Sequence, residues 1–216
     1  MIRLTKRIPP EELITRLQER TERFLHLLSV GRAVPDSLAS SYKDPEVKAL
    51  LRAETADKCA YCESKIPHIS YGDVEHIVPK SIRPETRFSY ENLTYACSIC
   101  NNKKSDYHDE QLPLLNPYVD EPGQHFIAAG PMVGRVPTSD RALVTEKRLE
   151  LNRSGLVERR KERLESIGTL LDQLARTTQP AIRSVLEAQL TEECADDKEF
   201  AFVVRGYVAA LLPLVA

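Results

Sequence analysis

Two pairs of closely spaced cysteines constrain this chain more than any other feature. Cys59 and Cys62 form the sequence CAYC, and Cys97 and Cys100 form CSIC. Two such pairs, each at the tip of a tight turn, complete a tetrahedral, all-cysteine zinc site. Because four thiolates leave no open coordination position, the sequence predicts a structural Zn²⁺ that fastens both ends of the intervening segment. Buried cysteines without a metal and a CxxC redox centre are the alternatives.

Length and charge limit the kinds of protein that this chain can be. With 216 residues it can form one large domain or a small catalytic unit surrounded by helices. Its formal net charge of −2 is not that of a protein that is basic overall. A surface that binds nucleic acid must therefore be local, or a partner must supply part of it.

No signal for export or membrane insertion is visible. The segment MIRLTKRIPPEEL contains neither an apolar run nor a cleavage site of small residues. The apolar stretch 200–216 is interrupted by Arg205 and Pro213 and is short for a membrane span. We therefore expect a cytoplasmic protein without a membrane segment, in a reducing compartment where paired CxxC motifs hold metal more often than disulfides.

Hydrophobic periodicity predicts helices on both sides of a short mixed segment. Helices are expected over 11–31, from Asp44 onward, and around 156–174, 182–190 and 200–211. Between them, strands are expected at 73–78 and 93–97, a short helix at 98–107 and a hairpin at 126–136. The predicted class is α+β, mainly helical around a small ββα core. Three segments are expected: N-terminal helices (1–57), the core with its zinc site (58–115), and the hairpin with the C-terminal helices (116–216).

Polar side chains suited to phosphodiester hydrolysis are concentrated between the cysteine pairs and just after them. They are Asp73, Glu75, His76, Asn92 and Asn101. Hydrolysis needs an activated water, a cation near the charge that develops on the phosphate, and stabilisation of the leaving oxygen. A histidine beside an acidic residue, with an amide on a facing helix, can supply all three. Singly, each residue also fits a packed histidine, a turn asparagine or a helix cap; together they favour a hydrolytic site.

The motifs EHIVP, an asparagine before a strand, and CxxCNxxK resemble the His-Asn-His (HNH) nuclease motif with its ββα-metal fold. The resemblance implies a metal-dependent endonuclease in which His76 is the general base. Glu75 and Asn101 would hold one divalent ion, Mg²⁺ or Mn²⁺, and Asn92 would fix the loop that aims the imidazole. The implied products carry a 5′ phosphate and a 3′ hydroxyl.

Two positions depart from the pattern of the HNH family. Glu75 stands where the family usually has aspartate or a second histidine, so Asp73 is an alternative acidic ligand. Asn101 stands in the third position in place of histidine, which favours a hard, oxygen-preferring ion over Zn²⁺. His108 is a candidate accessory ligand, with an ordinary surface histidine as the alternative.

Basic side chains near the motif are candidates for contacts to flanking phosphates. Lys80, Lys103 and Lys104 are neighbours of the predicted site residues in the sequence. A second basic group is either a phosphate-binding patch or a solvated helix face, and comprises Arg153, Arg159, Arg160, Lys161 and Arg163.

A similarity that extends beyond the motif resembles the HNH subunit of Septu-type bacterial anti-phage systems. The segments that carry it are MIRLTK with the Pro-Pro helix start, KCAYCESKI, YGDVEHIVPKS, NPYVDEPGQHFI and LELNR. The resemblance implies an effector that cuts nucleic acid, with DNA favoured over RNA, together with an ABC/SMC-like ATPase subunit (PtuA-like). Phe200 to Val215 is expected to contribute a partner or self-association surface. The alternatives are a stand-alone restriction-type DNase and a non-catalytic zinc-ribbon module that binds nucleic acid.

Overall fold

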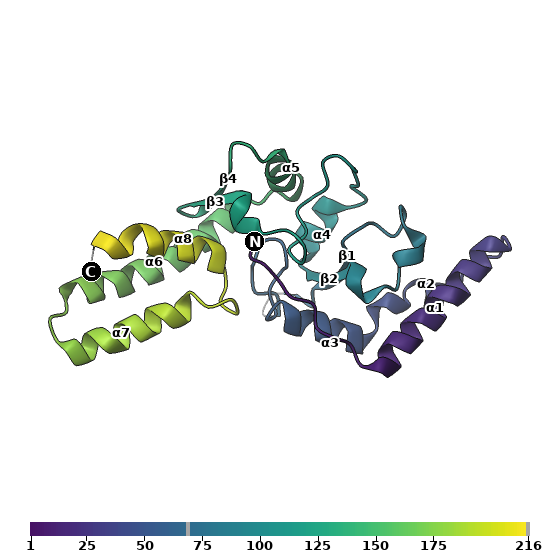
Figure 1. The fold of residues 1–216 in the computed structure, drawn as a ribbon, viewed down its shortest axis with the longest axis horizontal. Helices are drawn as coiled ribbons and strands as arrows, with labels where there is room; N and C mark the ends of the chain where they lie inside the picture. Colours follow the sequence, from purple (N-terminus) through teal and green to yellow (C-terminus); the bar gives the residue numbers. More distant parts are fainter. Residues whose placement is uncertain (68–69, 215–216) are drawn as a thin grey trace.

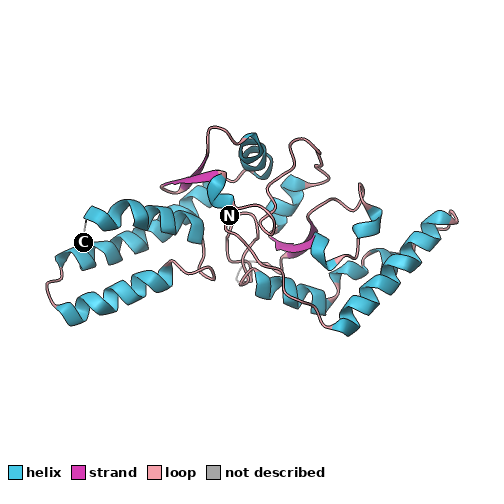
Figure 2. Cartoon of the chain, in the orientation of Figure 1, coloured by secondary structure: helices cyan, strands magenta, loops and turns pink. Residues whose placement is uncertain are grey.

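The computed structural model describes residues 1–67 and 70–214. Its α-helices are α1 (Glu11–Ser29), α2 (Asp36–Ala39), α3 (Pro45–Glu54), α4 (Ser98–Lys104), α5 (Asp140–Leu149), α6 (Ser154–Arg176), α7 (Pro180–Glu193) and α8 (Ala201–Leu211). Its strands are β1 (Asp73–His76), β2 (Leu93–Ala96), β3 (Phe126–Ala129) and β4 (Met132–Arg135). Short 3₁₀ helices are η1 (Ser41–Lys43), η2 (Pro84–Thr86), η3 (Tyr90–Asn92), η4 (Pro122–Gln124) and η5 (Leu212–Leu214). Helix predominates (Figure 2), so the expected class, mainly helical α+β, is confirmed.

The ββα unit is the centre of one lobe of the molecule (Figure 1). β1 and β2 pair antiparallel, with Glu75 opposite Thr94 and His76 opposite Leu93. α4 follows β2 directly, and the Cys97 thiol caps it by accepting from the backbone N–H of Cys100. The helix ends at Lys104, three residues earlier than expected, because Ser105 adopts a positive φ of 50°.

The N-terminal helices lie on one side of this unit (Figure 1). α3 begins as expected, since the Asp44 carboxylate accepts from the backbone N–H of Glu46 and Pro45 occupies the first turn. α2 and η1 were not expected from the sequence, because four- and three-residue helices leave no periodicity to detect. They bring the chain from α1 back to the ββα unit.

The C-terminal helices α6, α7 and α8 form a second lobe, and α5 with the β3–β4 hairpin lies between the two lobes (Figure 1). α8 packs against β3, where a side chain at Gly206 would collide with that of Ala128. Phe200, Val203 and Val204 are buried within the chain. The apolar face of α8, expected to meet a partner, is therefore covered by the chain itself; Val215 of that segment lies outside the described residues.

One hydrophobic cluster takes residues from all three expected segments, including Leu13, Leu93 and Leu149. A second cluster joins α6, α7 and α8. The division into three segments thus remains a prediction. Among the described residues, none of the helices has the length and apolar character needed to cross a bilayer.

Candidate active site and four-cysteine centre

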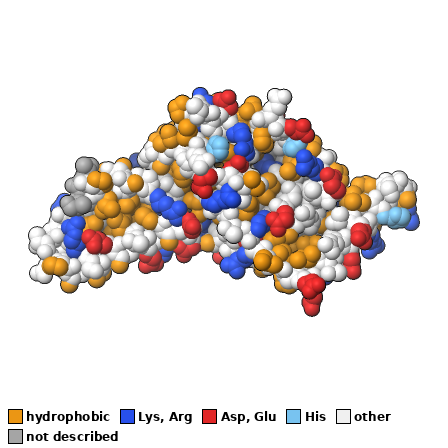
Figure 3. Space-filling model, viewed as in Figure 1, with side chains coloured by type: hydrophobic (Ala, Val, Ile, Leu, Met, Phe, Trp, Pro, Cys, Tyr) orange, Lys and Arg blue, Asp and Glu red, His pale blue; other side chains and the backbone are white. Residues whose placement is uncertain are grey.

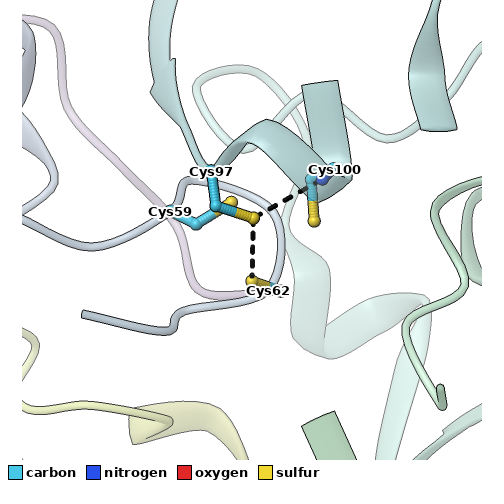
Figure 4. A group of neighbouring side chains, drawn as sticks. All are labelled: Cys59, Cys62, Cys97 and Cys100. Carbon is cyan, nitrogen blue, oxygen red and sulfur yellow. Dashed lines mark hydrogen bonds between the residues drawn. The ribbon is translucent and has the colours of Figure 1, made fainter. Parts of the chain in front are cut away.

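The four cysteines of the two CxxC pairs converge at one point (Figure 4). Cys59 and Cys62 come from the loop after α3, and Cys97 and Cys100 come from the junction of β2 and α4. All four are buried, and their sulfur atoms lie within 4.8 Å of one another. Cys62 Sγ and Cys97 Sγ are 3.9 Å apart, close to the ~3.8 Å that Zn–S bonds of about 2.3 Å give in a tetrahedron. The group is therefore positioned for metal binding and fits Zn²⁺.

Two arginines lie beside this centre. Arg153 Nη1 lies 3.9 Å from Cys100 Sγ, which raises the pKa of Arg153 against the lowering effect of its burial. Arg160 is 2% exposed and donates to the carbonyl oxygen of Leu151 at 2.8 Å. Their positive charges offset the negative charge that four thiolates place in a buried site.

The second basic group, residues 153–163, was expected either to bind phosphate or to face solvent. In the structure its members have different environments. Arg160 belongs to the interior, because α6 turns that face toward the core. Arg159 pairs with Glu162 at 2.5 Å, and Arg163 pairs with Glu193. Of the five residues, Lys161 alone is exposed without an ion pair among the described residues. The phosphate-patch interpretation is thus wrong for Arg160.

His76 ends β1, and its ring is held in one orientation. Nε2 lies 2.9 Å from the carbonyl oxygen of Arg87. Since a carbonyl oxygen only accepts, Nε2 carries the proton, and the lone pair of the neutral ring lies on Nδ1. Burial lowers the pKa of His76 to about 4, so the ring is neutral at pH 7.

Glu75 points into the same region and is paired with a buried lysine. Lys104 Nζ lies 2.7 Å from Glu75 Oε1 and 2.7 Å from the carbonyl oxygen of His76. Burial raises the pKa of the Glu75 carboxyl, and the Lys104 ammonium opposes that rise. Glu75 is therefore a buried carboxylate whose ionised form depends on a neighbouring cation.

Asn101, in α4, faces β1 across the unit. Its Nδ2 donates to Asp73 Oδ2 at 2.9 Å. Asp73 takes the amide N–H of Asn101 and fixes the orientation of the side chain. The amide oxygen, Oδ1, is the atom that a hard cation would use. Asp73 thus orients Asn101, while Glu75 and Asn101 both line the cavity described next.

Asn92 directly precedes β2 and fastens the loop that follows β1. Its Oδ1 accepts from the backbone N–H of Val78 at 2.8 Å, and its Nδ2 donates to the Val78 carbonyl oxygen at 2.9 Å. The same Nδ2 donates to Thr86 Oγ1 at 2.9 Å. Asn92 therefore joins the two ends of the loop that carries Arg87, the hydrogen-bond partner of His76.

A cavity with a volume of about 320 Å³ brings the site residues together. It is lined by Glu75, His76, Pro79, Lys80, Ser81, Asn101, Asn102, Lys104, Ser105 and Asp106. His108 lines a different cavity, so the accessory-ligand interpretation has no support from the geometry. The residues expected to act together thus share one cleft, apart from Asn92 and Asp73, which position its walls.

Two further residues at this site were not expected from the sequence. The Tyr42 ring packs edge-on against the imidazole of His76, with ring centroids 4.6 Å apart. The backbone carbonyl oxygen of Arg87 accepts from His76, and the guanidinium of Arg87 donates to the carbonyl oxygen of Ala39. Both contacts depend on how η1 packs against the loop after β1, and no short sequence motif predicts that packing.

The family comparison agrees with this geometry. Residues 59–107, from the first cysteine pair to just beyond α4, match the model of the HNH endonuclease family. The chain thus contains an HNH endonuclease domain. It is similar to the Septu protein PtuB of Bacillus thuringiensis, with 32% identity over 127 residues that make up 58% of this chain and 46% of that protein. It is also similar to the Septu protein PtuB of Bacillus mycoides (strain KBAB4), with 33% identity in a match that covers 40% of this chain and 39% of that protein. The match spans less than half the length of either curated relative.

Proposed function

We propose that this protein is a metal-dependent HNH endonuclease that hydrolyses phosphodiester bonds of nucleic acid. The observation that carries the proposal is the His76 imidazole, neutral and fixed through Nε2, in one cavity with Glu75 and Asn101. A neutral imidazole with a free lone pair can take a proton from water, and an oriented base contributes about 10²–10⁴-fold to such a reaction. The HNH family match over residues 59–107 supports the same reaction class.

In this proposal His76 Nδ1 accepts the proton of the attacking water, while the Arg87 carbonyl keeps the ring from turning. Asn92 preserves that arrangement by fastening the loop at Val78 and Thr86. Lys80, on the wall of the cavity, places a positive charge near the phosphate. Asp73 keeps the amide of Asn101 in register through a 2.9 Å hydrogen bond.

The residues present fit a hard divalent cation. Glu75 and Asn101 offer a carboxylate and an amide oxygen to the same cavity, the donor types that Mg²⁺ and Mn²⁺ prefer. Lys104 Nζ lies 2.7 Å from Glu75 Oε1, so a divalent ion held by Glu75 would share this carboxylate with the lysine. When bound, the ion supplies positive charge to the phosphate and to the departing oxygen.

We also propose that the protein acts in Septu-type anti-phage defence with an ATPase subunit. The support is its similarity to two proteins named Septu protein PtuB. The net charge of −2 is consistent with a nuclease that receives part of its grip on nucleic acid from a partner. A stand-alone DNase would cut without that partner and would bind DNA with a strong dependence on salt.

The test combines substrate, metal and partner in one experiment. Plasmid DNA and total RNA are incubated with the purified protein in Mg²⁺ or Mn²⁺, with and without the proposed ATPase partner. We expect cleavage that stops in EDTA and in His76→Ala, and that persists in His108→Ala, whose side chain lines a different cavity. Equal cleavage by His76→Ala and the unaltered protein would refute the enzymatic proposal. Full activity without the ATPase would refute the partnership alone.

A further inference from the structure

Lys43 and Lys80 place two positive charges beside the candidate active site. Lys43 belongs to η1, outside the HNH domain, and its Nζ lies 5.9 Å from the centroid of the Tyr42 ring. Lys80 Nζ lies 5.1 Å from the same centroid and 3.4 Å from Tyr42 Oη. Because the Tyr42 ring contacts the imidazole of His76, both ammonium groups lie one side chain away from that residue.

These two lysines are not neutralised by the protein. In the part of the chain that the structure describes, neither lies within 4.0 Å of a carboxylate oxygen. The carboxylate next to Lys43 in the sequence, Asp44, is held by Arg20 at 2.9 Å. Lys43 is exposed and Lys80 is half-buried, so their ammonium groups can meet a ligand from solvent.

The lysines on α4 are in the opposite situation. Lys103 pairs with Glu150, at the end of α5, at 2.5 Å. Lys104 is buried and pairs with Glu75. The sequence alone ranked Lys80, Lys103 and Lys104 together, but the structure leaves only Lys80 of these three unpaired among the described residues. Charges of both signs are mixed over the face shown in Figure 3, so such local differences decide where a polyanion can lie.

We propose that Lys43 and Lys80 bind the phosphates that flank the bond to be cut, so that the η1 segment forms one wall of the nucleic-acid track. The proposal rests on the proposed function and specifies how its substrate is held. A nucleic-acid backbone is the occupant that suits this wall, because it offers closely spaced negative charges that continue from the catalytic cleft. The N-terminal helices are thereby part of the substrate-binding surface and not only a support for the HNH domain.

The test measures binding apart from cleavage. His76→Ala protein, in Mg²⁺, is titrated with fluorescein-labelled DNA and RNA duplexes of one sequence, and anisotropy is recorded from 50 to 200 mM KCl. Lys43→Gln and Lys80→Gln are introduced singly and together. The double variant should weaken binding roughly tenfold or more and lower the slope of log K against log salt by about 2, since each lost phosphate contact removes about 0.9. The DNA and RNA arms show which backbone is held more tightly.

Two variants serve as controls. Lys161→Gln removes an exposed lysine of α6 that has no ion pair among the described residues, and it should leave the slope unchanged. Lys103→Gln removes a paired lysine on α4 and should change the slope by less than either test substitution. An unchanged slope in the double variant overturns the proposal, as does a loss in Lys103→Gln equal to that in Lys43→Gln. Absence of salt-dependent binding by the parent protein also overturns it. Failure of the proposed function would show in the plasmid and RNA assay as absent cleavage, while this binding measurement would still be readable.

Discussion

Lys104 Nζ lies 2.7 Å from Glu75 Oε1, and both side chains are buried. The pair joins the end of α4 to β1, the two elements that supply Asn101 and His76. The same ammonium also bonds the carbonyl oxygen of His76 at 2.7 Å. The lysine thus holds together the two halves of the site and neutralises its acidic residue.

Removal of Lys104 should make the stability of the folded protein more sensitive to a divalent ion. Lys104→Met leaves Glu75 as an unpaired buried carboxylate, which costs about 3–5 kcal/mol in free energy of unfolding. A divalent ion beside Glu75 offsets part of this cost. We therefore expect Mg²⁺ to raise the Tm of Lys104→Met by more than it raises that of the unaltered protein, as measured by thermal denaturation. The double variant Lys104→Met/Glu75→Gln should lose this extra response, and equal Mg²⁺ responses in all three proteins would contradict the ion site.

The side-chain amide of Asn101 is expected to act on metal affinity more than on the fold. Asn101→Ala removes an oxygen ligand from a half-buried position, so the Mg²⁺ concentration for half-maximal cleavage should rise roughly 100-fold. Asn102→Ala, one residue further and exposed, should shift it little. The measurement is the initial cleavage rate against Mg²⁺ concentration, with circular dichroism to check folding. If higher Mg²⁺ concentrations restore none of the cleavage rate lost in Asn101→Ala, Asn101 is not a ligand of the ion.

The ββα unit could be predicted because its signals are local. The CxxC spacing, the EHIVP motif and the asparagine of α4 all lie within a few residues of the groups that they organise. The proline and aspartate that begin α3 are signals of the same short range. Features of such short range can be recognised from the sequence alone. The convergence of the four sulfur atoms follows from the two CxxC pairs.

Contacts between distant segments could not be predicted in this way. The pairing of Lys104 with Glu75 spans the width of the unit, and Tyr42 reaches His76 from η1. By sequence Arg160 belongs to a basic patch, but α6 turns its side chain into the core, close enough to Cys62 for their charges to interact. α5 was missed although Ser139 gives a visible N-cap, since its ten residues contain few apolar positions.

The four-cysteine centre predicts a metal-dependent fold. Cys59→Ser removes one of four ligands, so we expect the protein to lose Zn²⁺ and most of its cooperative unfolding transition. Cys194→Ser, in the turn after α7 and far from the centre in sequence, should retain one Zn²⁺ per chain. Atomic absorption gives the metal content, and differential scanning calorimetry gives the transition. Full Zn²⁺ content in Cys59→Ser would exclude the proposed ligand set.

The buried imidazole of His76 predicts how stability depends on pH. Its pKa is lowered from 6.5 in the unfolded chain to about 4 in the folded protein, chiefly by burial. Between these values the unfolded state binds more protons, so stability is complete above pH 6.5 and declines as pH falls toward 4. From pH 7 to 5.5 the loss from this group is about 1 kcal/mol. Urea denaturation of the unaltered protein and of His76→Gln, which cannot titrate, should show that difference in their slopes against pH. Glu75 and the four cysteines are common to both proteins, so parallel slopes would mean that His76 is not held neutral in the folded state.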